Sequence, residues 1–158
     1  MASVYDVAKY FISLSEPETD REITHLKLQK LVYYAHAWHI AAYDGDPLVE
    51  DDNIEAWIHG PVFPRLYREY RHYGYSQINY SEDLIGNINA LHHNEIDIIH
   101  VVWEIYGEFS GKYLENLTHT EEPWINAREG HDNFDYGNNV ITNDDLLHYY
   151  GPLFAQMI

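Results

Sequence analysis

Apolar positions recur mainly at helical spacing along this chain. Near the start they return every three or four residues from position 4 to position 14, which predicts one amphipathic helix. Ser3 stands where its hydroxyl can cap the first turn, and Asp6 follows three residues later, as in a capping box. Pro17 should end the helix, because proline disfavours helical backbone at the residue before it.

The most apolar predicted helix covers residues 24–43, with Thr24 as its cap. Its stripes are Leu28, Leu31, Ala35, Trp38 and Ala42 on one side, and Val32, His36, His39 and Tyr43 beside them. Together these stripes cover a wide arc of the helix surface. Such a helix is typical of the buried centre of a helical bundle.

The rest of the chain also favours helices. Further helices are predicted to begin at Pro64, Asn94 (with Asp97 at the third position), Ser110, Thr120 and Thr142. The last one covers 143–157, with Asp145 completing a capping box, and Gly151-Pro152 should kink or interrupt it. Residues 54–58 favour a short extended segment, Gly60-Pro61 a tight turn, and 130–139 a loop that includes His131-Asp132. We therefore expect a mainly α, compact single domain over 1–158, built around the helix at 24–43.

Composition narrows the possible functions. The 158 residues include nine Lys+Arg and 26 Asp+Glu, a formal net charge of −17. This charge argues against nucleic-acid binding and favours a basic protein partner. The absence of cysteine excludes thiolate catalysis and Cys-ligated zinc. We expect a cytoplasmic protein, because the sequence shows neither a signal peptide nor an apolar run long enough to span a membrane.

The most acidic short segment follows the predicted central helix. It begins with the turn residues Asp44-Gly45-Asp46-Pro47 and should form an exposed loop. Exposed loops often determine the choice of partner. Its carboxylates are therefore the candidate partner-binding residues: Asp44, Asp46, Glu50, Asp51 and Asp52.

Three of the nine cations recur at three-residue spacing on the helix that begins at Pro64. They are Arg65, Arg68 and Arg71. Such a row suits either of two roles. It can form a basic rim for an acidic ligand or phosphate, or it can pair internally with the excess of carboxylates. The composition favours internal pairing.

No pattern in the sequence predicts a catalytic site or a cofactor. His36 and His39 share a helix face and offer two imidazoles to a metal, but the sequence supplies no third ligand. Buried histidines satisfied by hydrogen bonds have the same pattern. No serine or threonine is paired with an evident base, and no two carboxylates are placed for acid–base catalysis. We therefore expect a protein that is not an enzyme, with no metal site.

Three stretches carry a family resemblance: residues 23–35, 54–67 and 117–128. Their motif positions are Thr24, Lys27, Gln29, Trp57, His59, Gly60, Pro61, Thr118, His119, Pro123, Trp124 and Arg128. Together these stretches resemble the Panacea domain of SocA-like antitoxins and related phage-associated proteins. We expect the motif side chains to form a buried or half-buried polar network that holds the helices together.

The resemblance implies an antitoxin that binds its toxin directly. Family toxins are encoded beside the antitoxin and are of several types, including nucleotide pyrophosphokinase-like enzymes. A variation within the family is an adaptor that delivers the toxin to a ClpXP-type protease. We expect an acidic, tyrosine-rich face to cover a basic surface of the toxin. Two other hypotheses stay open: an acidic DNA mimic acting against restriction, and a metal-dependent hydrolase built on His36 and His39.

Overall fold

The computed structural model describes residues 2–130 and 137–158. The described residues form seven α-helices, two short 3-10 helices and a three-stranded sheet, which confirms the mainly α prediction. The predicted loop containing His131-Asp132 lies largely outside the described residues.

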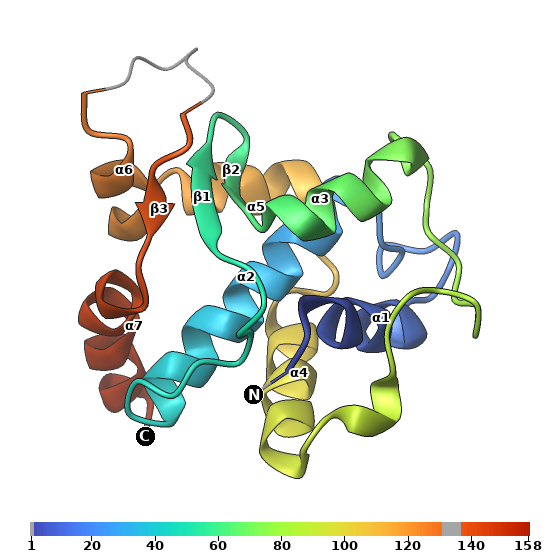
Figure 1. Cartoon of the computed structure of the whole chain (residues 1–158), viewed down its shortest axis with the longest axis horizontal. Coiled ribbons are helices and arrows are strands. Elements are labelled where there is room, and N and C mark those ends of the chain that lie inside the picture. The colour runs from blue at the N-terminus through green and yellow to red at the C-terminus, as the bar shows by residue number, and fades with distance from the viewer. Residues whose placement is uncertain (1, 131–136) are drawn as a thin grey trace.

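Helix α2 (His25–Ala42) is the centre of the fold, as the sequence predicts. It packs against α1 (Val4–Leu14), α3 (Pro64–Tyr70), α4 (His93–Tyr106), α5 (Gly111–Thr118) and α7 (Asn143–Met157). Figure 1 shows α2 running diagonally through the molecule, with α7 on one side and α1 and α3 on the other. Because neighbours surround it, all but five of its eighteen residues are buried, and two of the buried residues are lysines.

Most helix starts follow the predicted caps. The hydroxyls of Ser3, Thr24 and Ser110 accept backbone N–H bonds at the starts of α1, α2 and α5. Thr142 and Asp145 form the predicted capping box of α7. Asp6 forms no capping box with Ser3, because its carboxylate accepts a hydrogen bond from the Asn87 backbone N–H instead.

Two other predictions about helices are wrong in detail, and of the kink or interruption predicted at Gly151-Pro152 the interruption does not occur. The cap of α4 is His92, not Asn94, and Glu95 completes a capping box there. Helix α6 (Glu122–Ala127) begins after Glu121, one residue later than a cap at Thr120 implies. Gly151-Pro152 does not interrupt α7, which continues to Met157.

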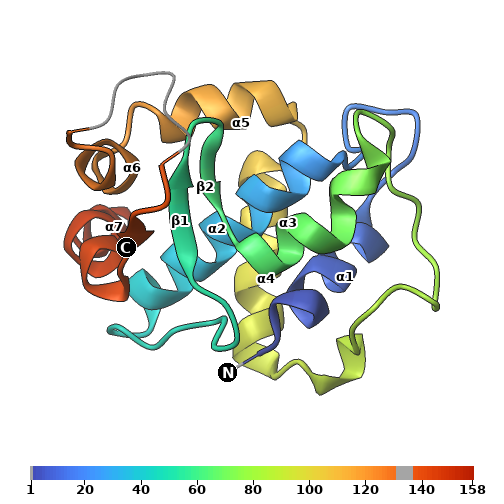
Figure 2. The same ribbon diagram turned by 45° about the horizontal axis from the view of Figure 1, so that its top comes forward.

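The extended segment is part of a small sheet with the order β2-β1-β3. Strand β1 (Ile54–Trp57) pairs antiparallel with β2 (Gly60–Val62) and with the two-residue β3 (Val140–Ile141). Gly60-Pro61 therefore belongs to a hairpin strand, where the sequence predicts a turn; Ile58-His59 makes the turn. In Figure 2 the hairpin lies in front of α2, between α7 and α3. It brings the second motif stretch onto the central helix.

The 3-10 helices are η1 (Arg71–Tyr73), which extends α3, and η2 (Ile88–Ala90), which precedes α4. The segment between them crosses beside α1, and Lys9 on α1 donates to the carbonyl oxygens of Glu82 and Gly86. No helix among the residues that the structure describes is long and apolar enough to cross a membrane.

Candidate functional site

The acidic loop, residues 44–52, joins α2 to β1. It leaves the helix through Asp44 and Gly45, both in left-handed conformations (φ 53° and 93°). The carbonyl of Asp46 accepts a hydrogen bond from His39 Nδ1 at 2.7 Å, and the side chains of Leu48 and Val49 are buried. Ala2 bridges to Val49, so the loop is tied both to the central helix and to the start of the chain.

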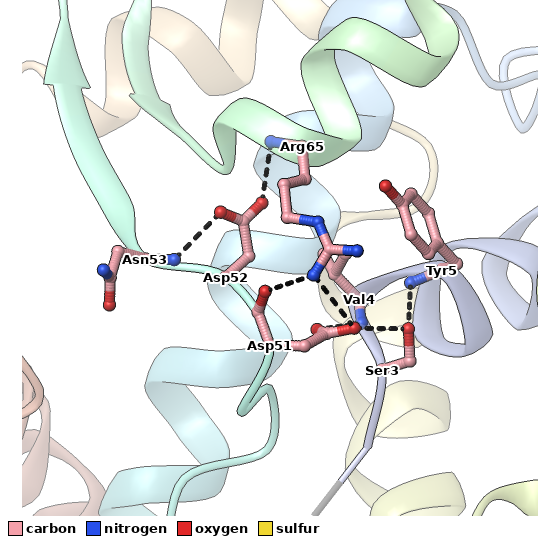
Figure 3. Close-up of polar contacts among 7 residues, drawn as sticks. All are labelled: Ser3, Val4, Tyr5, Asp51, Asp52, Asn53 and Arg65. Carbon is pink, nitrogen blue, oxygen red and sulfur yellow. Dashed lines mark hydrogen bonds and ion pairs between the residues drawn. The ribbon is translucent and has the colours of Figure 1, made fainter.

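Two of the five candidate carboxylates stabilise the fold (Figure 3). Asp51 accepts hydrogen bonds from Ser3 Oγ (2.7 Å) and from the Val4 backbone N–H (2.9 Å), at the start of α1. Asp52 accepts one from the Arg65 backbone N–H (2.9 Å), at the start of α3. Arg65 also donates to the Asp51 carbonyl oxygen at 2.7 Å. These carboxylates thus fasten the loop to two helices.

The other three carboxylates of the loop face solvent. Asp44, Asp46 and Glu50 are exposed, and no hydrogen bond or ion pair to their side chains occurs among residues 2–130 and 137–158. Glu50 lines a hollow of about 360 Å³ whose walls combine polar groups, including Asp52 and Asn143, with apolar ones, including Ile54 and Val140. The loop therefore presents unpaired negative charge beside a depression.

His36 lies at the base of this hollow and its two ring nitrogens are both bonded. Nδ1 accepts from the Val49 backbone N–H (3.1 Å), so Nε2 carries the proton and donates to Asn143 Oδ1 (2.9 Å). Burial lowers the pKa of His36 from 6.5 to about 4, which keeps the ring neutral. The described part of the chain holds no cluster of three His, Asp or Glu side chains able to bind a metal. His36 and His39 therefore have structural hydrogen bonds in place of metal-ligand geometry.

The motif residues meet elsewhere, where α2, the β1–β2 hairpin and α5 come together. The Lys30 cluster consists of Lys30, Gly60, Pro61, Glu115 and Thr118. The fully buried Lys30 ammonium donates to the Pro61 carbonyl oxygen (3.2 Å), and a Cβ on Gly60 would lie 2.6 Å from Lys30 Cε and 2.9 Å from Thr118 Oγ1. Only glycine fits here, and its φ of +105° also favours glycine.

Charges in the Lys30 cluster are partly compensated. Burial lowers the pKa of Lys30 from 10.5 to about 7, although the charge of Glu115 opposes this shift. Glu115 contacts Lys112 Nζ (2.9 Å) and His59 Nδ1 (3.3 Å). Burial alone would raise the pKa of Glu115, but these two partners hold it below its usual value. Neither Lys30 nor Glu115 was predicted from the sequence. The one usable signal was that Lys30 stands on a helix that is apolar on nearly every face, where a lysine must be buried.

The third motif stretch fastens α6 to the hairpin. Trp124 Nε1 donates to the Trp57 carbonyl oxygen (2.7 Å), and Arg128 donates to the Ala56 carbonyl oxygen (2.9 Å). Arg128 also lies over the Trp124 ring, on which His119 stacks at 3.9 Å between ring centroids. The two side chains thus join α6 to strand β1 by hydrogen bonds to strand carbonyl oxygens, and ring stacking holds them against each other.

Two motif side chains on α2 differ in how they are satisfied. Lys27 donates to the carbonyl oxygens of Asp20 and Gly107, and burial lowers its pKa to about 8. Gln29 is 1% exposed, and neither of its amide atoms has a hydrogen-bond partner in the described part of the chain. Thr24 caps the helix and Pro123 lies in the first turn of α6. The predicted polar network thus includes one buried amide with no partner.

A further carboxylate, the half-buried Glu121, was not singled out from sequence. It accepts hydrogen bonds from Tyr34 OH (2.7 Å) and Tyr150 OH (3.0 Å), and Tyr33 OH lies 3.2 Å from Tyr150 OH. Burial raises the pKa of Glu121, and the two hydroxyls partly oppose this shift. The network joins α2, α6 and α7. It supports the bundle and exposes no reactive group.

The comparisons with known proteins give one match. A family model described as "Antitoxin SocA-like, Panacea domain" matches residues 28–125, from the second turn of α2 into α6. No curated protein and no solved structure matches the chain. The matched region holds the Lys30 cluster, the hairpin and the whole acidic loop. The chain therefore belongs to the SocA-like antitoxin family with a Panacea domain.

Proposed function

We propose that this protein is an antitoxin that binds its cognate toxin directly and covers the toxin's active surface. The family match is the observation that carries the proposal. We propose further that residues 1–158 act as one domain and do so without enzymatic activity. A toxin encoded by the adjacent gene, such as a nucleotide pyrophosphokinase-like enzyme, is the expected partner.

The acidic loop is the proposed toxin-binding surface. Asp51 and Asp52 hold the loop in place, while Asp44, Asp46 and Glu50 are available to a partner. Opposite charges across an interface speed encounter and fix orientation. The hollow beside Glu50 combines apolar walls with carboxylates, so it suits a lysine or arginine of the toxin, whose stem is apolar and whose end is charged.

The first experiment is co-expression with the product of the adjacent gene, scored by growth rescue and by pull-down. A stable complex with rescue supports neutralisation by binding. Rescue with loss of the toxin and no lasting complex supports the protease-adaptor alternative. If co-expression gives no complex and no growth rescue, the proposal is contradicted and the DNA-mimic alternative is favoured.

A triple variant then tests the loop: Asp44→Asn, Asp46→Lys and Glu50→Lys. Asparagine is chosen at position 44 because it tolerates the left-handed backbone there. The matched control, Asp83→Asn, Glu104→Lys and Glu129→Lys, makes the same charge change at exposed carboxylates on other elements. We expect the loop variant to bind the toxin at least about tenfold more weakly than the control. If the two variants bind the toxin equally well, the acidic loop is not the toxin-binding surface.

A further inference from the structure

Seven of the nine lysine and arginine side chains have partners within the chain, although 26 carboxylates are present. Six of the seven donate to backbone carbonyl oxygens, and the seventh pairs with Glu115. These are Lys9, Arg21, Lys27, Lys30, Arg65 and Arg128, followed by Lys112. The cations therefore act mainly to satisfy carbonyl groups of the fold.

Arg68 and Arg71 are the two exceptions. Both are exposed, and neither side chain has a hydrogen bond, ion pair or ring contact among the residues that the structure describes. The composition favoured internal pairing for the whole arginine row, and that prediction is wrong for these two. Being three residues apart, they share one face, whereas Glu69 is rotated from Arg68 by about 100° around the helix.

An aromatic residue follows Arg71 four positions later in the chain. Tyr75 is completely exposed, at 101% of its reference area. Gly74, with φ of +57°, turns the chain just before it. In the same stretch of chain, the Tyr73 ring stacks on the buried Tyr70 ring (5.9 Å between centroids), so this part of the backbone is packed against the core. Arginine and tyrosine are, with tryptophan, the residue types enriched at binding hot spots. We call Arg68, Arg71 and Tyr75 the Arg–Tyr patch.

The charge of the patch indicates its partner. Guanidinium groups bind carboxylates through paired hydrogen bonds. Two cations on a chain of net charge −17 are too few to follow a nucleic-acid backbone. A second copy of this chain is disfavoured, because two such chains repel each other. The segment directly after α2 lies on the opposite side of the molecule from the end of α3 (Figures 1 and 2), although the loop then runs back to the start of α3 at Arg65. Pairing of the start of the loop with the patch of a second copy would therefore be a head-to-tail contact.

We propose that the Arg–Tyr patch binds a carboxylate-bearing segment of the toxin. This proposal rests on the antitoxin function proposed above. The patch is then a second contact, opposite in sign to the exposed carboxylates of the acidic loop and separate from them. Two contacts of opposite charge fix the orientation of the bound toxin. A toxin bound in the reverse orientation would meet like charges at the acidic loop and at the Arg–Tyr patch.

The test measures binding of purified protein to the product of the adjacent gene by calorimetry. Arg68→Gln with Arg71→Gln removes both charges from the patch. The control, Asn116→Glu with Gln156→Glu, makes the same change in net charge at exposed positions on α5 and α7. All four side chains are exposed, and none has a hydrogen bond, ion pair or ring contact among the described residues, so both variants should fold, which thermal melts would verify. We expect the arginine variant to bind at least about tenfold more weakly, and the control to bind like the wild type.

The possible outcomes separate the proposal about the Arg–Tyr patch from the antitoxin proposal. If the wild type binds the toxin and the arginine variant binds with the same affinity, the proposal about the Arg–Tyr patch is overturned and the antitoxin proposal stands. An equal loss in both variants would also overturn the patch, since net charge alone would explain it. Absence of wild-type binding would overturn both proposals. As a further arm, Arg68→Glu with Arg71→Glu should regain affinity for a toxin in which the contacted carboxylates are changed to lysine.

Discussion

Polar groups of the Lys30 cluster face one another inside the fold, whereas three carboxylates of the acidic loop face solvent. In the cluster Lys30 donates to the Pro61 carbonyl oxygen of the hairpin, Thr118 to the Glu115 carbonyl oxygen of its own helix, and Gly60 leaves no room beside either side chain, so a small change must disturb several contacts together. In the loop, Asp44, Asp46 and Glu50 can change without disturbing the fold. The comparison suggests that the motif residues maintain the domain, while the loop is free to vary with its partner.

The largest expected effect comes from adding one methyl group to the cluster. Gly60→Ala would place Cβ 2.6 Å from Lys30 Cε at a φ of +105°. We expect the free energy of unfolding to fall by about 3 kcal/mol or more, from overpacking and backbone strain combined. Urea denaturation measures this.

Gly74→Ala is the matched control for that change. Gly74 also has a positive φ (+57°), but nothing lies within 4 Å of its added Cβ. It should lose only about 1 kcal/mol, from backbone strain alone. Similar losses at both positions would show that the cluster is not tightly packed.

A medium effect should separate the two kinds of carboxylate in the loop. Asp51→Ala removes the bonds to Ser3 Oγ and the Val4 N–H and should lower the free energy of unfolding by about 1–2 kcal/mol. Asp46→Ala should change it by less than about 0.5 kcal/mol, because its side chain is exposed and unpaired. Thermal melts of the two variants make the comparison. A large loss for Asp46→Ala would mean that the loop is held by more than Asp51 and Asp52.

The smallest expected effect concerns the buried amide of Gln29. Gln29→Met removes two polar atoms that have no partner, so stability should stay unchanged or rise by up to about 1 kcal/mol. Thr118→Val is the matched change at a satisfied group, since Thr118 Oγ1 donates to the Glu115 carbonyl oxygen, and it should lose about 1 kcal/mol. Chemical denaturation can resolve the two. A clear loss in Gln29→Met would indicate that water bonds to this amide.

Local signals in the sequence were enough to predict most helices. A serine or threonine just before a stretch of apolar residues at helical spacing marks a helix cap, because capping depends on residues within one turn. The caps found in this way are Ser3, Thr24, Ser110 and Thr142. The hairpin strand β2 was missed, because Gly60-Pro61 has the composition of a turn and Pro61 cannot donate a ladder hydrogen bond. Strand β3 has only two residues and pairs with β1 from more than eighty positions away.

The candidate site shows the same limit. The sequence located the acidic loop, but nothing local distinguishes Asp51, which binds the start of α1 47 positions away, from Asp46, which is exposed. Likewise Lys30 has the composition of a surface residue, and only the packing of the hairpin and α5 around α2 buries it. Bonds between distant segments decide which polar residues are available to a partner.

The buried lysine has a thermodynamic consequence for calorimetry. In the folded chain the pKa of Lys30 is about 7, and burial is the main cause. In the unfolded chain it returns to its ordinary value near 10.5. Between these two values the unfolded state binds more protons, so unfolding takes up protons from the solvent and stability rises with pH. The heat of unfolding measured at pH 8 should therefore depend on the ionisation enthalpy of the buffer, and Lys30→Met should reduce that dependence.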